Sequence, residues 1–194
     1  MALASPQPRV IADVVHTAWV RNIVLVVAGT AFVSICAQVA IPLPFTPVPL
    51  TLQTFAVVLT AGVLGSWRGA ASMLLYAIIG SLGAPIFFLG SSGFGGVTFG
   101  YVIGFIVGAF VVGRIAEGGA TRHFWRAVGL MVIGNVIIYA FGTTWLAISL
   151  QWDAATAIAK GVLPFLVGDA IKILIAAGLL PLTWKGLQKA GLAD

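Results

Sequence analysis

The sequence predicts an all-α integral membrane protein with six transmembrane helices and with both chain ends on the cytoplasmic side. Composition is the first reason, because 60% of the 194 residues are hydrophobic and 8% are charged, whereas about a quarter of the residues of a soluble domain are charged. The mean hydropathy of +1.11 agrees with this interpretation. Six apolar runs and an uneven distribution of basic residues are the other two reasons. The chain is therefore expected to be a multi-pass protein of the cell membrane, with the lipid bilayer as its solvent.

Six apolar runs account for the predicted helices, since each is bounded by charged residues, proline or glycine. The second and fourth runs contain about 16 residues, close to the lower limit for crossing a bilayer, so short helices extended by ordered loops are expected there. Gly83 and Pro85 interrupt the third run and predict that its helix kinks or ends there, followed by backbone buried in protein. The runs lie near residues 23–41, 50–65, 70–89, 98–113, 127–150 and 162–182.

Residues 20–184 are predicted to form one six-helix membrane domain between a cytoplasmic lead-in, residues 1–19, and a cytoplasmic tail, residues 185–194. If successive loops lie on alternate sides of the membrane, Lys160 is the one basic loop residue on the outer side, and the other basic residues of the loops and chain ends lie on the cytoplasmic side. Such an uneven distribution is typical of membrane proteins. The loops expected outside are residues 42–49, 90–97 and 151–161. The basic residues expected on the cytoplasmic side are Arg9, Arg21, Arg68, Arg114, Arg122, Arg126, Lys185 and Lys189.

Two of the predicted outer loops have unusual compositions. Residues 42–49, which we call the proline loop, read P-L-P-F-T-P-V-P, and their four prolines exclude helix and stiffen an extended backbone. Residues 90–97 read G-S-S-G-F-G-G-V, a stretch that can bring backbone N–H groups and hydroxyls close to a bound molecule. A stiff loop and a flexible loop on one face predict a covered cavity, although both also suit the simple connection of helices.

Asp169 and Lys172 are the two ionisable residues that the prediction places inside the membrane, both in the sixth run. Their spacing puts them on one helix face, about 10 and 15 Å below the outer end of the helix. One interpretation is a salt bridge that joins helices, but a buried pair is a poor stabiliser because its desolvation offsets its attraction. The other interpretation is a site in which an acceptor and a donor recognise the polar head group of a small, mostly apolar ligand.

Further polar and aromatic residues are candidates for the lining of such a cavity. Gln53 and Tyr101 are favoured because they lie in the outer half of their runs. Each candidate alone also suits a helix-packing hydrogen bond or an interfacial aromatic. The full set is Thr51, Gln53, Thr54, Ser91, Ser92, Tyr101, Asn135, Tyr139 and Trp145.

Several classes of function are excluded by what the sequence lacks. The ten basic residues form no patch, so nucleic acid is not an expected partner despite a net charge of +5. No nucleotide-binding glycine cradle is present, and the five acidic residues are scattered, so no metal site is expected. Because His16 and His123 lie in predicted cytoplasmic segments, no nucleophile and base can be paired in the membrane, and an enzyme is not expected. Cys36, the single cysteine, is expected to be a packing residue.

The first run contains a face of small residues, in which Thr30 and Ser34 lie four apart. Small side chains let two helices approach closely. This face therefore either packs inside the protein or docks a partner membrane protein, and both interpretations stay open at the level of sequence.

Four segments in order carry a resemblance to a known family. They read A-Q-V-A-I-P-L-P-F-T-P-V-P-L-T-L-Q-T-F-A-V from Ala37, L-Y-A-I-I-G-S-L-G-A-P-I-F from Leu75, I-Y-A-F-G-T-T-W-L-A from Ile138 and G-V-L-P-F-L-V-G-D-A-I-K from Gly161. Over about residues 23–182 the chain thereby resembles BioY, the biotin-specific substrate-binding (S) components of energy-coupling factor (ECF) transporters. The P-x-P-x-T-L-Q-T and G-D-x-x-K segments are the most specific to that family.

The resemblance implies the ECF S-component fold and a subunit that binds biotin with high affinity and mediates its uptake, with no cofactor. It implies a transmembrane T component and two ATP-binding subunits as partners that energise uptake. A stand-alone facilitator or ion-coupled permease for biotin or a related vitamin is the alternative. Thr30 and Ser34 take the family's docking positions for the T component, where alanines are usual. Val97 and Phe99 depart from the family's G-P-T-G-G-Y pattern before the fourth helix.

Asp169 and Lys172 take the positions of the family's aspartate and lysine on the last helix. As a hypothesis, Asp169 accepts a hydrogen bond from the cyclic urea of biotin. Lys172 either donates to the urea oxygen or pairs with the valerate carboxylate, for which Ser91, Ser92 and loop N–H groups are rival donors.

Overall fold

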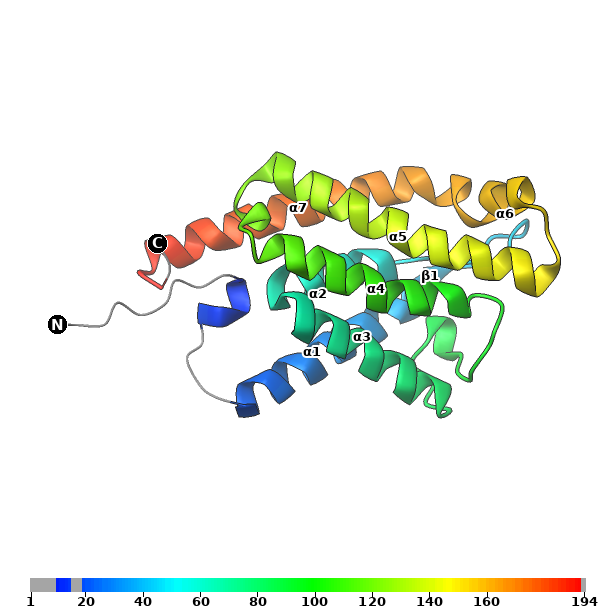
Figure 1. Cartoon of the computed structure of the whole chain (residues 1–194), viewed down its shortest axis with the longest axis horizontal. Helices are drawn as coiled ribbons and strands as arrows, with labels where there is room; N and C mark the ends of the chain where they lie inside the picture. The colour runs from blue at the N-terminus through cyan, green and yellow to red at the C-terminus, as the bar shows by residue number, and fades with distance from the viewer. Residues whose placement is uncertain (1–9, 15–18, 193–194) are drawn as a thin grey trace.

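The computed structural model describes residues 10–14 and 19–192 and shows a bundle of six longer helices joined by short elements (Figure 1). The longer helices are α1 (Trp19–Gln38), α2 (Gln53–Leu64), α3 (Ser66–Ser81), α4 (Phe99–Ala116), α5 (Phe124–Leu150) and α7 (Leu166–Lys189). The short elements are the 3₁₀ helices η1 (Ile11–Val14), η2 (Phe88–Gly90), η3 (Ala120–Arg122) and η4 (Leu163–Phe165), the helix α6 (Ala154–Gly161), and the antiparallel strands β1 (Ala40–Ile41) and β2 (Leu50–Thr51).

The six longer helices coincide with the six apolar runs. Four stretches of the described residues are long and apolar enough to cross a membrane: Trp19–Gln38, Phe99–Ala116, Phe124–Leu150 and Ala154–Lys189. Helices α2 and α3 are shorter, with 12 and 16 residues. The prediction of an all-α protein with several apolar spans is therefore confirmed, whereas the count of six transmembrane helices stays a prediction.

The loop between α3 and α4, residues 82–98, differs in part from the prediction. Helix α3 ends at Ser81, as expected, and Gly83 follows with a left-handed φ of +106°. The prediction that the next stretch of backbone is buried is wrong for most of this loop, in which the Phe94 side chain is 77% exposed. Phe87 is the exception at 6% exposed, because the absence of a side chain at Gly80 leaves room for its ring.

The other two predicted outer loops contain regular structure that the sequence analysis did not predict. The proline loop contains no helix, as expected, but it is not extended throughout, because the Thr46 N–H donates to the Leu43 oxygen at 3.4 Å across a turn at Pro44 and Phe45. The short β1–β2 pair joins its two ends. The third loop contains α6, which begins after Asp153. The carboxylate of Asp153 accepts hydrogen bonds from the backbone N–H and the hydroxyl of Thr156, at 3.0 and 2.7 Å. Asp153 is therefore the N-cap of α6. An aspartate three residues before a threonine is the sequence pattern that indicates the start of this helix.

The bundle has two chemically different ends (Figure 1). The proline loop, the α3–α4 loop and α6 lie at one end, which we call the loop end. The start of α1, the α4–α5 connection and the end of α7 lie at the other, which we call the basic end. The alternation of loops that the charge count assumes is thus present in the fold. Basic residues at the basic end include Arg114, Arg122, Arg126, Lys185 and Lys189.

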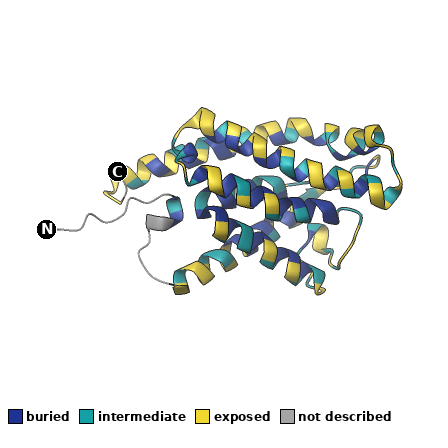
Figure 2. Cartoon of the chain, in the orientation of Figure 1, coloured by how far each residue is buried: buried dark blue, intermediate teal, exposed yellow. Residues whose placement is uncertain are grey.

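Helix α4 lies in the middle of the bundle, packed against α2, α3 and α5. Figure 2 shows the buried residues along its length and exposed residues on the outer faces of the surrounding helices. Three glycines spaced four apart, Gly100, Gly104 and Gly108, face α5. A Cβ at Gly104 would lie 2.9 Å from the Cα of Ile138, so the two backbones approach as closely as they do because no side chain separates them.

The small-residue face of α1 packs inside the bundle. Thr30 is 6% exposed, and its hydroxyl donates to the backbone oxygen of Ser72 in α3 at 2.9 Å. A Cβ at Gly29, on the same face, would lie 2.6 Å from the Ser72 hydroxyl oxygen. Ser34 is half-buried and donates to the backbone oxygen of Thr30. Of the two interpretations of this face, the structure shows internal packing at Thr30, and the docking of a partner by Thr30 and Ser34 stays a prediction.

The turn between α2 and α3, at the basic end, is held by a carboxylate from the end of α4. Gly65 turns the chain with a φ of +84°. One Glu117 oxygen accepts from both the backbone N–H and the hydroxyl of Ser66, at 2.8 and 2.7 Å, and the other accepts from Arg114 at 3.0 Å. Burial raises the pKa of Glu117, but the Ser66 bonds and the Arg114 charge outweigh it and hold this pKa below its usual value.

Replacing Glu117 with Gln is expected to destabilise the protein by about 1 kcal/mol at pH 7, because the N-terminus of α3 loses a charged cap. The folded-state pKa of Glu117 is lowered, so its stabilisation is present above the pKa of an unfolded glutamate, about 4.3, and is lost as the pH falls toward the folded value. Thermal unfolding from pH 7 to 3 should therefore show the difference between wild type and variant shrinking below about pH 4.5.

The matched control is Arg114→Gln, which leaves the Ser66 bonds in place. It should have a smaller effect, since the Arg114 side chain is 70% exposed and solvent screens its charge. If the difference in thermal stability between wild type and Glu117→Gln stays constant down to pH 3, the carboxylate charge does not contribute to the stability of the fold.

Candidate functional site

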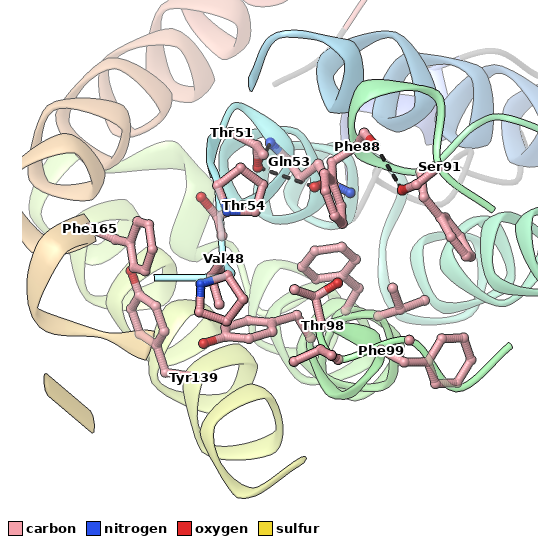
Figure 3. A pocket seen from close by; sticks show the side chains of 18 of the residues that line it. Val48, Thr51, Gln53, Thr54, Phe88, Ser91, Thr98, Phe99, Tyr139 and Phe165 are labelled. Atoms are coloured by element: carbon pink, nitrogen blue, oxygen red, sulfur yellow. Dashed lines mark hydrogen bonds between the residues drawn. The ribbon is translucent and has the colours of Figure 1, made fainter. Parts of the chain in front are cut away.

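A cavity of about 330 Å³ lies at the loop end of the bundle (Figure 3). Its wall combines the proline loop, the start of α2, the α3–α4 loop and the halves of α4, α5 and α7 that lie toward the loop end. Apolar atoms form most of this wall. The lining residues are Pro47, Val48, Pro49, Thr51, Gln53, Thr54, Phe87, Phe88, Ser91, Ser92, Gly93, Gly96, Val97, Thr98, Phe99, Tyr101, Val102, Phe105, Tyr139, Phe165, Asp169 and Lys172.

Four polar side chains from three helices meet in this wall. Asp169 and Lys172 form an ion pair with 2.7 Å between Oδ1 and Nζ, and their side chains are only 5% and 12% exposed. Thr54 of α2 donates to the same carboxylate oxygen at 3.2 Å and accepts from Lys172 at 3.4 Å. The Tyr139 hydroxyl of α5 donates to the other oxygen of Asp169. The buried carboxylate thus has a partner on each oxygen, as a charged group in an apolar interior requires.

Helix α7 places this pair at the cavity because of where it starts. Pro164 lies in the 3₁₀ turn η4, and α7 begins at Leu166, so Asp169 falls in its first turn. A carboxylate there is stabilised by the positive end of the helix dipole. Lys172 follows on the same face, which turns both charges toward α2 and α5.

The remaining polar groups of the wall are mostly bonded to the protein itself. Gln53 donates to the Tyr76 hydroxyl at 2.7 Å, and the Thr51 hydroxyl donates to Gln53 at 3.2 Å. The hydroxyl of Ser91 donates to the backbone oxygen of Phe88 at 2.8 Å (Figure 3). Tyr101 donates to the backbone oxygen of Gly161 at 2.8 Å. These bonds hold the side chains in place, which favours a pre-formed cavity.

Every residue that the sequence predicts for ligand binding lies in this one cavity. The seven residues are Gln53, Ser91, Ser92, Tyr101, Tyr139, Asp169 and Lys172. The further candidates Thr51 and Thr54 also line it, as do Val97 and Phe99 from the stretch that departs from the family pattern.

Two further candidates do not line the cavity. Asn135 is buried in α5, one turn from Tyr139, and its side-chain oxygen has no hydrogen-bond partner among the described residues. Trp145 lies against the α3–α4 loop, where its indole N–H donates to the backbone oxygen of Gly96 at 3.0 Å. Asn135 and Trp145 are therefore candidates that the cavity wall does not include.

The particular phenylalanines of the cavity wall are what the sequence does not identify. Phe87, Phe88, Phe99, Phe105 and Phe165 all line the cavity, and the rings of Phe87 and Phe99 lie 6.5 Å apart. With 12 phenylalanines in a chain that is 60% hydrophobic, nothing in the sequence distinguishes these five from those that face lipid. Only the fold separates the two groups.

A second cavity, of about 500 Å³, lies at the basic end. Trp67, Arg68, Arg114 and Glu117 are among its lining residues. Glu117 in this cavity pairs with Arg114 and accepts from the backbone N–H of Ser66 at the start of α3, so these charged groups already stabilise the fold. The cavity at the loop end, with its buried ion pair and apolar wall, is the better candidate for a ligand site.

An all-α bundle with membrane-length apolar helices and a mostly apolar cavity at one end is the architecture of a multi-pass membrane protein with a candidate site for a small molecule. The model of the BioY family matches residues 7–189. The chain belongs to the BioY family, which is a family of membrane transporters and not of enzymes.

Relatives and a solved structure agree with this membership. The chain is 40% identical over 169 residues to the biotin transporter BioY of Thermotoga maritima, covering 84% of this chain and 96% of that protein. It is 38% identical over 159 residues to the probable biotin transporter BioY of Pyrococcus horikoshii, covering 80% and 91%. The fold is similar to the crystal structure of the S-component for biotin from an ECF-type ABC transporter, with a TM-score of 0.77, 24% identity and coverage of 86% and 92%.

Proposed function

We propose that this chain captures biotin in the cavity at the loop end and is the S component of an ECF transporter, energised by a T component and two ATP-binding subunits. The observation that carries the proposal is the buried Asp169–Lys172 pair in the wall of a mostly apolar cavity. Membership of the BioY family supports biotin as the ligand, since relatives aligned over nearly their whole length are named as biotin transporters.

The cavity suits the two parts of biotin. Its volume of about 330 Å³ is at the lower end of the range for small-ligand pockets, so one small molecule fills it. The sulfur-containing ring and the aliphatic chain of biotin are apolar and match the phenylalanine wall. The cyclic urea has N–H donors beside a carbonyl acceptor, which match a carboxylate and an ammonium group.

We infer that the urea, rather than the carboxylate, lies at the ion pair. Asp169 and Lys172 are 2.7 Å apart, so their charges compensate each other and leave little net attraction for an anion. Ser91, Ser92 and the N–H groups of the α3–α4 loop then receive the carboxylate. The affinities of a Lys172→Ala variant for biotin and for biotin amide test this orientation. An equal loss of affinity for both ligands would support it. A larger loss for biotin than for biotin amide would mean that the carboxylate lies at the ion pair instead.

We propose further that six helices cross the membrane with the basic end in the cytoplasm. The excess of arginine and lysine at this end is the usual mark of the cytoplasmic side. Three tryptophans near it, Trp19, Trp67 and Trp125, are 70%, 78% and 77% exposed, as expected of side chains at a membrane interface. The cavity then opens toward the outside, where biotin is captured.

Biotin binding by the purified chain, measured by isothermal titration calorimetry, tests the ligand. Uptake of labelled biotin by cells that lack their own transporter, with and without the T component and the ATP-binding subunits, tests the coupling. Concentrative uptake that requires these partners supports an S component. Concentrative uptake by the lone chain would favour the alternative, an ion-coupled permease, and equilibration without accumulation would favour a facilitator.

A further inference from the structure

Gln38, the last residue of α1, connects that helix to the loop that covers one side of the cavity. Its side-chain nitrogen donates to the backbone oxygens of Phe87, at 3.1 Å, and Ile86, at 3.4 Å. Its side-chain oxygen accepts from the backbone N–H of Gly90 at 2.9 Å. The same nitrogen lies 3.0 Å from the backbone oxygen of Ser34 in α1. One amide side chain therefore connects the backbone of α1 with the backbone of a loop about 50 positions further along the chain.

The loop that Gln38 holds forms part of the cavity wall. Residues 82–98 contribute Phe87, Phe88, Ser91 and Ser92 to the lining, whereas Gln38 itself does not line the cavity. Two of its bonds reach Phe87 and Gly90, which flank the lining residue Phe88. Any effect of Gln38 on a ligand must therefore act through the position of this loop.

Besides Gln38, the tip of the loop is held by hydrogen bonds of its own backbone, such as that from the Phe87 N–H to the Ser91 oxygen at 3.0 Å, and by the Phe94 ring, whose centroid lies 4.7 Å from that of Phe99. Leu89 has a left-handed φ of +51°, and Gly90, Gly93 and Gly95 also have positive φ values. A Cβ at any of these three glycines would meet no atom within 4 Å, so the tip is loosely packed. The buried ring of Phe87 holds its start, and backbone or indole hydrogen bonds hold Gly93 and Gly96.

The proline loop, on the other side of the cavity, is held by a different part of the bundle. The Thr46 hydroxyl donates to the backbone oxygen of Lys160 in α6 at 2.8 Å and accepts from the N–H of Val48 at 3.2 Å. The two loops that cover the cavity thus have different hydrogen-bond partners: Gln38 of α1 holds the α3–α4 loop, and α6 holds the proline loop, which also follows α1 directly along the chain.

We propose that Gln38 is a positioning residue that keeps the α3–α4 loop closed over the bound ligand, so that loss of its contacts opens the cavity and speeds ligand release. This inference rests on the proposed function for the identity of the ligand, biotin.

The test compares Gln38→Asn with wild type and with a matched control. Asparagine keeps the amide but is one methylene shorter, so it cannot span the distance to the loop. The control is Gln151→Asn, because Gln151 is also an exposed glutamine at the loop end, and its nitrogen donates to Ile148 of its own helix. Gln38→Glu is a second variant, which keeps the acceptor for the Gly90 N–H but loses the donor to Phe87 and Ile86.

Two measurements are made on each purified full-length protein. Hydrogen exchange of the segment 86–93, without biotin, reports the closure of the loop. The dissociation rate of labelled biotin after a chase with unlabelled biotin reports release. For Gln38→Asn we expect faster exchange in that segment and an increase of about five- to twenty-fold in the dissociation rate, consistent with the loss of two or three exposed hydrogen bonds. Gln38→Glu should be intermediate, and Gln151→Asn should match wild type.

Unchanged exchange of residues 86–93 in Gln38→Asn would overturn the inference whether or not biotin binds. Faster exchange with an unchanged dissociation rate would also overturn it, because the loop would then not control release. If wild type fails to bind biotin, the proposed function is wrong, and the exchange measurement alone still decides whether Gln38 holds the loop.

Discussion

Replacing Asp169 with Asn is expected to lower the affinity for biotin at least about 100-fold. Asparagine keeps the shape of the side chain but removes the charge that compensates Lys172, whose side chain is only 12% exposed. Removing one partner of a buried ion pair costs about 3–5 kcal/mol, and 1.4 kcal/mol corresponds to about a factor of ten in affinity. The variant also puts an amide N–H₂ where a carboxylate oxygen accepts from Tyr139 or Thr54.

Titration calorimetry with biotin, together with thermal unfolding without ligand, separates recognition from stability. Asp153→Asn is the matched control, because Asp153 is an exposed acid at the same end, and asparagine replaces it well as an N-cap. A variant that unfolds at a lower temperature but binds biotin with wild-type affinity would show that the pair only joins helices. The assignment of Asp169 to the urea would then be wrong.

Replacing Gly113 with Ala is expected to destabilise the protein by about 3 kcal/mol or more, at the upper end of overpacking effects. A Cβ at Gly113 would lie 2.3 Å from the backbone carbon of Gly65 and 2.4 Å from the backbone nitrogen of Ser66. Both atoms belong to the turn between α2 and α3, which Glu117 holds through Ser66. Because the obstacle is backbone rather than a flexible side chain, the turn itself would have to move.

Thermal unfolding in detergent measures this effect, and a decrease in Tm of roughly 10 °C is expected. Gly129→Ala in α5 is the control, since a Cβ there would meet no atom within 4 Å. Alanine favours a helix more than glycine by about 1 kcal/mol, so this variant should be as stable as wild type or slightly more so. Equal Tm values for the two variants would contradict the close approach of α4 to the α2–α3 turn.

The polar half of the candidate site could be predicted from the sequence because polar residues are rare in it. Asp169 and Lys172 are conspicuous in an apolar run, and their spacing already places them on one face. The sequence could not show that Thr54 and Tyr139, which come from two other helices, complete the hydrogen bonds of Asp169. Hydrogen bonds between helices depend on how the helices pack, and no local pattern records that.

Asn135 and Tyr139 illustrate the same limit. They lie four residues apart on α5 and are both candidates for the cavity lining, yet only Tyr139 lines the cavity. A helix keeps both side chains on one face, but the cavity ends between them, because it is confined to the loop end. How far a cavity reaches along a helix depends on the neighbouring helices and loops. The spacing of residues therefore predicts which helix face borders a site, but not how far along the helix the site extends.

Composition and charge by themselves determined the solvent, the helical class and the alternation of the loops, because each follows from the chain locally: apolar runs need lipid, and basic residues mark one side. The family resemblance also came from local motifs. The tertiary structure decided which phenylalanines face the cavity and that Thr30 faces α3. It also decided that Gln38 connects α1 to the α3–α4 loop. In a chain this uniformly apolar, lipid-facing and cavity-facing side chains are chemically alike, so only the packing of the helices distinguishes them.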